Sequence, residues 1–224
     1  MKNLLRLISL LLLISMLVPV AVADDEEMEY EPDFTLYEVG DTFFMGVCEQ
    51  DNNRNNGFEP IEWLVLDKFE DRLFVISLYC LESDSYYNPP GVKYKYTTSE
   101  ECDVRAFLNT EFYTCAFTDL ERSMIALTHN RNDDNPDYGI EGGNDTEDRL
   151  AIPSIAELHT FLSWQPLRQT QYAFNGKAGW YWMRNMGLTL QYPAYISYDG
   201  TFNYTPHPIT EAAGVRPVMY VDVG

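Results

Sequence analysis

The sequence predicts an α+β domain, because runs typical of strands, then of helices, then of strands again follow one another along the chain. Apolar runs at 43–48, 63–66 and 73–78 predict the first strands, and the polar stretch 67–72 predicts a hairpin between the last two. The closing strands are predicted at 180–184, 192–197, 201–204 and 215–221. The Asp-Gly pair at 199–200 is typical of a two-residue hairpin turn.

About three helices are expected between these two groups of strands. Each begins with a Ser or Thr followed three residues later by Glu, the spacing of a capping box. The pairs are Thr98 with Glu101, Thr118 with Glu121, and Ser154 with Glu157. Apolar residues at helical spacing follow each pair, so each helix has one face to bury.

The first 23 residues have the three parts of an export signal. Lys2 and Arg6 are basic, 7–18 is apolar, and 21–23 offers the small residues that a signal peptidase accepts. The apolar run is short for a bilayer, so we predict a signal peptide over 1–23 that is cleaved. An uncleaved N-terminal anchor is the alternative.

Behind the signal, 24–37 is predicted to be an acidic flexible lead-in, and 38–224 is long enough for a single domain. The chain has 35 Asp and Glu against 15 Lys and Arg, a net charge of −20. Such a charge argues against binding nucleic acid or anionic membrane, and no stable membrane insertion is expected after signal cleavage. The protein is therefore expected to be secreted or to lie in the extracellular cell envelope, and the same charge also suits plain solubility.

The four cysteines are Cys48, Cys80, Cys102 and Cys115. The segment between the last two is predicted to be helical, which places its ends about 20 Å apart, whereas a disulfide needs Cα atoms within about 7 Å. Either Cys48 and Cys80 each pair with one of the later two, or the thiols remain reduced.

Several segments, in this order, carry a family resemblance: 61–67, 102–109, 112–117, 142–148, 180–184 and 214–218. Together they resemble a large family of exported bacterial proteins known as a domain of unknown function, over roughly 38–222. The C-terminal half is also similar to the C-type-lectin-like core of formylglycine-generating enzymes, with Gly-x-Arg on the last strand and a tryptophan strand beside it. This resemblance implies a C-type-lectin-like mixed sheet with about three helices packed on it. Those enzymes carry redox cysteines late in the chain, and no Cys follows Cys115 here, so their copper-dependent oxidation is not expected.

Catalytic motifs are not evident. His129, His159 and His207 lie far apart and lack zinc-ligand spacing. No nucleophile-elbow, phosphate-binding or dinucleotide-binding motif is present. Carboxylates are abundant, but no pair is singled out, so a carboxylate-dependent hydrolase is an alternative rather than the main hypothesis.

A long polar loop between His129 and Asp148, called the polar loop below, suggests one cofactor, calcium. Asp133, Asn135 and Asp137 alternate as oxygen ligands do in calcium loops. Tyr138 stands where an EF-hand needs Gly, and Asn144 stands where it needs Glu, so an irregular calcium site is predicted. A solvated, turn-rich loop is the alternative.

Arg216 lies between apolar residues in a segment that reads as buried. A buried guanidinium needs a partner, so we predict that Asp148 or Glu157 pairs with it in a structural role.

Aromatic and amide side chains gather in the last strands, and flat rings beside amides suit sugar or peptide ligands. The predicted ligand-binding residues are Trp182, Arg184, Asn185, Tyr192, Tyr198, Asn203 and Tyr204. Strand alternation sends about half of such a set to each face, so a fully packed aromatic core is the alternative. The sequence thus predicts a non-enzymatic recognition module for an envelope glycan or protein. A hydrolase and a structural domain without a ligand remain as alternatives.

Overall fold

The computed structural model describes residues 33–81, 97–173, 175–207 and 212–223, which belong to one compact unit, Asp33–Gly224. The predicted signal peptide lies outside the described residues, as does the lead-in up to Pro32. Mixed sheets and short helices make up the unit, which confirms the α+β class.

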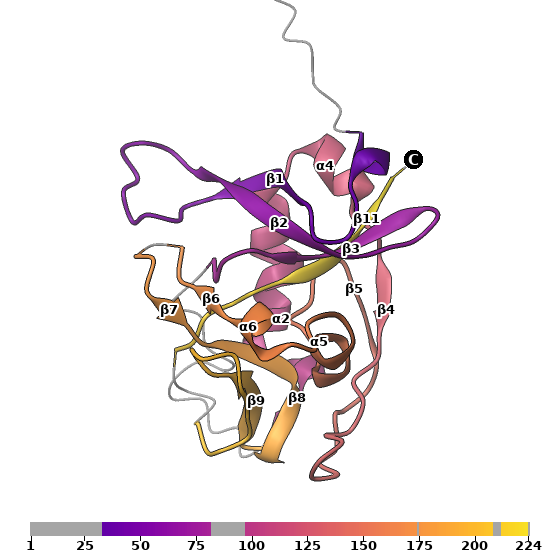
Figure 1. Ribbon diagram of the computed structural model, residues 1–224, viewed down its shortest axis with the longest axis vertical. Helices are drawn as coiled ribbons and strands as arrows, with labels where there is room; N and C mark the ends of the chain where they lie inside the picture. The colour runs from indigo at the N-terminus through magenta and orange to yellow at the C-terminus, as the bar shows by residue number, and fades with distance from the viewer. Residues whose placement is uncertain (1–32, 82–96, 174, 208–211, 224) are drawn as a thin grey trace, which may run out of the picture. The chain divides into compact units, whose positions relative to one another are not determined.

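The main sheet has the strand order β1-β2-β3-β11, and every neighbouring pair is antiparallel (Figure 1). Its strands are β1 Thr42–Cys48, β2 Glu59–Lys68, β3 Arg72–Ser77 and β11 Val218–Asp222. The hairpin predicted between β2 and β3 is confirmed. The segment 49–58 joins β1 to β2 in a second hairpin, with Cys48 opposite Glu59.

Both faces of β3 are covered, as expected for a strand that lies inside a sheet. Leu73 and Val75 belong to one hydrophobic cluster, and Phe74 and Ile76 belong to another. Since successive side chains of a strand point to opposite faces, β3 separates the two clusters. β1 is an edge strand, and its Phe44 is 63% exposed.

The helices pack on opposite sides of this sheet. A continuous helical segment comprises α2 Asp103–Phe107, the π-helical η3 Leu108–Phe112 and α3 Tyr113–Ala116. It buries Val104 and Leu108 in the first cluster. The second cluster receives α5, Ile155–Phe161, through Ile155 and Leu158. The remaining short helices are η1 Phe34–Leu36, η2 Ser99–Glu101, α4 Asp119–Met124 and α6 Gln165–Arg168.

Two of the three predicted capping boxes are confirmed, those that begin at Thr118 and Ser154. The third is wrong, because the Thr98 side chain makes no capping bond and only the 3-10 turn η2 follows it. The helix starts later, at Asp103, and the Sγ atom of Cys102 accepts the Arg105 backbone N–H as its cap.

A second sheet has the order β10-β9-β8, formed by β8 Tyr181–Thr189, β9 Tyr192–Ile196 and β10 Phe202–Asn203. The two sheets meet at Gly214. Its N–H donates to the Trp180 carbonyl at 3.0 Å, and its carbonyl accepts the Trp182 N–H at 3.3 Å. The chain therefore forms backbone hydrogen bonds with the start of β8, the strand that contains Trp182, before it enters β11.

Two small ladders complete the described fold, one pairing β4 Thr128–Asn130 with β5 Thr146–Asp148 and one pairing β6 Thr170–Gln171 with β7 Ala178–Gly179. The first ladder closes the ends of the long polar loop.

The predicted flexible lead-in 24–37 is too long. Phe34 is only 2% exposed and packs edge-on against Phe43 with ring centroids 4.9 Å apart. An aromatic side chain inside the core holds its neighbours in place, so residues 33–37 belong to the folded unit.

Candidate functional site

A cleft of about 560 Å³ opens where the end of β3 meets α6, the β6–β7 ladder and the turn after β9. Its lining is formed by Leu78, Tyr79, Gln169, Thr170, Gln171, Gly176, Ala178 and Tyr198. These residues come from four separate stretches of the chain. As far as the structure describes the chain, the lining contains hydroxyl, amide and aromatic groups but no charged side chain.

The turn that carries Tyr198 is held firmly. The Nε2 atoms of Gln165 and Gln169 both donate to the Asp199 carbonyl, at 3.0 and 2.9 Å. The guanidinium of Arg168 donates to the Gly200 carbonyl at 2.8 Å. Gly200 adopts φ +84°, a left-handed conformation that favours glycine. Because α6 and its C-cap residue hold this turn through three hydrogen bonds, the backbone that carries the Tyr198 ring is fixed, although the residue is 68% exposed.

Three polar side chains of the cleft are available to a ligand. Among the described residues, the side chains of Tyr79, Tyr198 and Gln171 form no hydrogen bond, whereas the Thr170 hydroxyl donates to the Leu78 carbonyl and the Gln169 amide to the Asp199 carbonyl. Two phenol rings beside primary amides offer flat apolar surface together with donors and acceptors. Such a combination recognises a molecule that has both an apolar face and hydroxyl groups.

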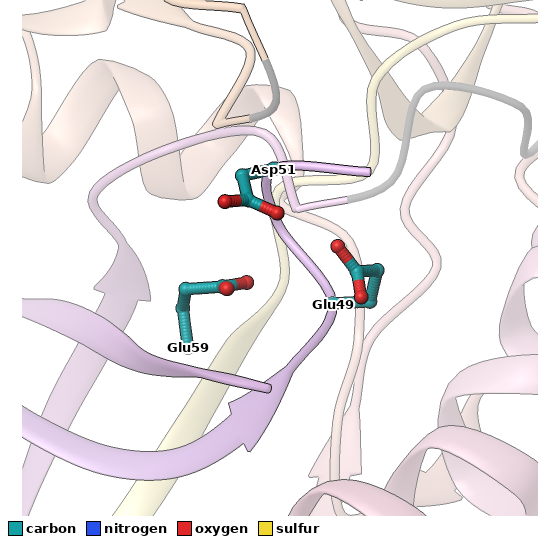
Figure 2. Close-up of side chains that lie close together, drawn as sticks. All are labelled: Glu49, Asp51 and Glu59. Carbon is teal, nitrogen blue, oxygen red and sulfur yellow. The ribbon is translucent and has the colours of Figure 1, made fainter. Parts of the chain in front are cut away.

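A cluster of three carboxylates lies at the start of the β1–β2 hairpin loop. One oxygen each of Glu49, Asp51 and Glu59 lies within 4.8 Å of the others, and Figure 2 shows the three side chains facing a shared space. Oxygen atoms at such spacing are the ligands that calcium prefers. This cluster is therefore where the described part of the chain could hold a metal ion.

The same carboxylates also shape the loop. Glu59 Oε2 accepts the Gln50 N–H at 2.7 Å, and the Asn53 N–H is shared between Asp51 Oδ1 at 2.8 Å and Glu49 Oε1 at 2.9 Å. Glu49 Oε2 is buried and has no hydrogen-bond partner in the described part of the chain. This cluster is not evident in the sequence, since only the pairing of β1 with β2 brings Glu59 beside the other two.

The calcium trio predicted in the polar loop is engaged in protein contacts. Asp133 pairs with Arg131 at 2.6 Å. Asn135 is 1% exposed, and its Oδ1 accepts the N–H groups of Asp137 and Tyr138 at 2.9 and 3.2 Å. The Oδ1 atom that a calcium ion would need therefore already stabilises a turn of the loop.

Three of the predicted ligand-binding residues are buried, as the alternative of a packed core would have them. Trp182 is 0% exposed. Arg184 donates two hydrogen bonds to Glu157, at 2.6 and 2.9 Å. Asn185 accepts the Ile155 N–H at 2.8 Å through Oδ1. Trp182 lies in the first hydrophobic cluster, whereas Arg184 and Asn185 bond to α5 and to backbone carbonyls of Arg131 and Asp133.

Of the other four predicted binding residues, one lines the cleft and three do not. Tyr198 lines the cleft. Tyr192, Asn203 and Tyr204 are half-buried and do not line it. Burial, with a smaller contribution from the neighbouring Asp137, raises the pKa of Tyr204 well above its usual range.

The predicted partner of Arg216 was also wrong. Arg216 donates to the Ser77 carbonyl at 2.9 Å, to the Tyr181 hydroxyl at 3.3 Å and to the Arg168 carbonyl at 3.5 Å. The ends of β3 and α6 expose carbonyl groups that helix and sheet leave unpaired, and these replace a carboxylate.

Asp148 and Glu157 do hold arginines, but different ones. Asp148, 3% exposed, pairs with Arg105 at 2.8 Å, and Glu157 pairs with Arg184 at 2.6 Å. Their predicted structural role therefore agrees with these contacts, while the assignment of partners does not.

Comparison with known families identifies the chain. The model of the DUF6273 domain of unknown function matches residues 70–223, so the protein belongs to that family. The cleft lies inside the matched range, and the carboxylate cluster lies before it. The searches of curated proteins and of solved structures found no match. None of the described helices has the length and apolar character needed to cross a membrane.

Proposed function

We propose that the protein is an exported, non-enzymatic recognition module that binds a neutral glycan of the bacterial cell envelope in the Tyr79–Tyr198 cleft. The observation that carries this proposal is the exposed, firmly based Tyr198 ring in a cleft whose Tyr79 and Gln171 side chains have no hydrogen-bond partner among the described residues. Sugars present an apolar face to a ring and hydroxyls to amides, so the groups match.

The charge of the chain narrows the class of glycan. With a net charge of −20, the surface repels anionic polymers, and the described lining of the cleft offers no cation to a uronic acid or a phosphate. Neutral sugars avoid this repulsion and suit an uncharged lining.

Export and the C-type-lectin-like core belong to the same proposal. The basic, apolar and small-residue pattern over 1–23 supports export. The bonds of Gly214 to the tryptophan strand support a core in which the last segment joins that strand, as the resemblance implies.

Calcium is proposed as a structural partner rather than a ligand of the sugar. The carboxylates of Glu49, Asp51 and Glu59 are the donors that support this role. None of them lines the cleft, so a chelator is expected to affect the loop more than the binding of the sugar.

A hydrolase would need two facing carboxylates, one of them with a raised pKa. Among the described residues, the cleft lining contains no Asp or Glu. Partial loss of solvent raises the pKa of Asp103, but Asp103 does not line the cleft. These observations favour binding over hydrolysis.

The test is a binding screen of the full chain against neutral envelope glycans, with calcium and with chelator. Tyr198→Ala is expected to weaken binding at least about tenfold, since aromatic anchors contribute about 1–2 kcal/mol or more. Tyr138→Ala is the matched control, because Tyr138 is another exposed tyrosine, 50% accessible, outside the cleft. The proposal is wrong if no neutral glycan binds in either condition, or if both variants bind equally well. Binding to an envelope protein that ignores Tyr198 would instead favour a protein partner.

A further inference from the structure

A second cavity, of about 370 Å³, lies between the β1–β2 loop and the helical segment that contains α2 and α3. Its walls are mostly apolar, formed by Val47, Phe58, Leu81, Phe107, Phe112 and Ala116. The volume is at the small end of the range of about 300–1,000 Å³ that ligand pockets occupy.

Part of the apolar wall is open to solvent. Phe58 is 58% exposed and Val47 is 39% exposed, while Phe112 and Leu81 deeper in the wall are each 8% exposed. An apolar depression with exposed aromatic edges loses contact with water when a ligand fills it, which favours an apolar ligand body.

The charges around this cavity are mainly negative. Glu49, Glu111 and Arg54 are its charged lining residues. Among the described residues, the Glu111 carboxylate and the Arg54 guanidinium form no hydrogen bond or ion pair. Oxygens of Asp51 and Glu59 lie within 4.8 Å of Glu49, so two more carboxylates stand beside one lining glutamate, and Arg54 is the one lining cation among the described residues. Because like charges at such distances repel, the local potential favours a cation.

We propose that this cavity binds an organic cation, an ammonium group attached to an aromatic or aliphatic body. The body lies against Phe58, Phe107 and Phe112, and the ammonium group meets Glu111 at the open edge. Phenyl rings attract cations through their faces, so the apolar wall and the charge act in the same direction. The site shares no lining residue with the Tyr79–Tyr198 cleft, so this inference does not depend on glycan binding.

The test uses three probes that share one phenyl ring and differ in charge: phenylalaninamide, phenylalanine and N-acetylphenylalanine. Each is titrated into the full chain by calorimetry at low salt. Phenylalaninamide, the cation, is expected to bind saturably and most tightly, and N-acetylphenylalanine, the anion, most weakly. Added salt is expected to weaken the binding of the amide, since the attraction is partly Coulombic.

Two variants locate the site. Glu111→Gln is expected to weaken phenylalaninamide binding about fivefold, the upper end for an exposed ion pair. The matched control is Glu70→Gln, an exposed glutamate in the β2–β3 turn, at the far end of β2 from the cavity, and it is expected to change nothing. Thermal unfolding of both variants shows whether each is folded.

Three results would overturn the proposal. The first is that phenylalanine or N-acetylphenylalanine binds more tightly than phenylalaninamide. The second is that Glu111→Gln and Glu70→Gln change phenylalaninamide binding equally. The third is that phenylalaninamide does not bind saturably. If calcium binds saturably while the amide does not, the carboxylates form a metal site and the organic-cation assignment is wrong.

Discussion

Trp182 is the residue whose removal tests the core most directly. Its ring is 0% exposed and packs edge-on against Trp180 at 5.2 Å and against Tyr195 at 6.2 Å, measured between ring centroids. A buried tryptophan side chain removes about 150–250 Å² from water. At about 25 cal/mol per Å², that burial contributes about 4–6 kcal/mol, of which an alanine would retain a small part.

Trp182→Ala is therefore expected to lower the free energy of unfolding by about 3–5 kcal/mol, in the range measured for large aromatic residues in cores. For a domain of this size, each kcal/mol shifts Tm by about 2–4 °C, so a decrease of about 10 °C is expected. Urea unfolding followed by tryptophan fluorescence measures the free energy of unfolding, and calorimetry measures Tm.

The control is Trp164→Ala. Trp164 is 66% exposed, so its loss is expected to change the free energy of unfolding by no more than about 0.5 kcal/mol. An unchanged Tm for Trp182→Ala together with lost ligand binding would refute the assignment of Trp182 to the core and return it to a ligand surface.

Glu157→Gln is expected to lower stability by about 3 kcal/mol in urea unfolding, because it removes the carboxylate charge that pairs with the buried guanidinium of Arg184; a loss below about 1 kcal/mol would contradict this reasoning. Burial raises the pKa of Cys80 to about 12, so its thiolate is scarce near pH 8, and iodoacetamide is expected to label the exposed Cys115 well before Cys80; peptide mass mapping decides, and equal labelling would refute it. The hydrogen bond to Glu147 raises the pKa of His129, so this contact stabilises the fold below the ordinary histidine pKa and is lost as the pH rises through the raised one. NMR titration of the ring is expected to show the raised pKa, and Glu147→Gln is expected to lower it; a pKa at or below the ordinary value would contradict the contact.

Local features of the fold were predictable from the sequence. The capping boxes at Thr118 and Ser154 each depend on residues only three positions apart, so the pattern and the structure coincide. The box at Thr98 failed for a local reason too, since the chain turns once as a 3-10 helix and Cys102 takes over the cap. A sequence pattern shows that a cap is available, but it does not show which residue the backbone selects.

The cleft was predictable only in part. Tyr198 was among the predicted binding residues because its strand was recognised as aromatic. Tyr79 and Gln171 were not, since they approach Tyr198 only through long-range pairing, in which Cys80 forms a parallel bridge with Tyr172. No spacing in the sequence encodes that meeting.

Buried charges show the same limit. The need of Arg216 for partners follows from its apolar neighbours, but the identity of those partners does not. Carbonyl groups at the ends of β3 and α6 satisfy it, and this leaves Asp148 and Glu157 to pair with Arg105 and Arg184. The sequence shows that each buried charged side chain needs a partner, but the topology determines which group is close enough to be that partner.

The cleft and the cavity proposed for the cation are lined by different parts of the chain. The cleft is built entirely within 70–223, the range that the family model matches. The cation cavity combines Phe107 and Glu111 from that range with Glu49, Arg54 and Phe58 from the β1–β2 hairpin, which precedes it. Changes in the 49–58 loop therefore alter the charge and walls of one cavity and leave the other intact, because no residue of that loop lines the cleft. In the two proposals, the hairpin loop therefore contributes to the specificity of the cation site, and the matched part of the domain forms the glycan cleft.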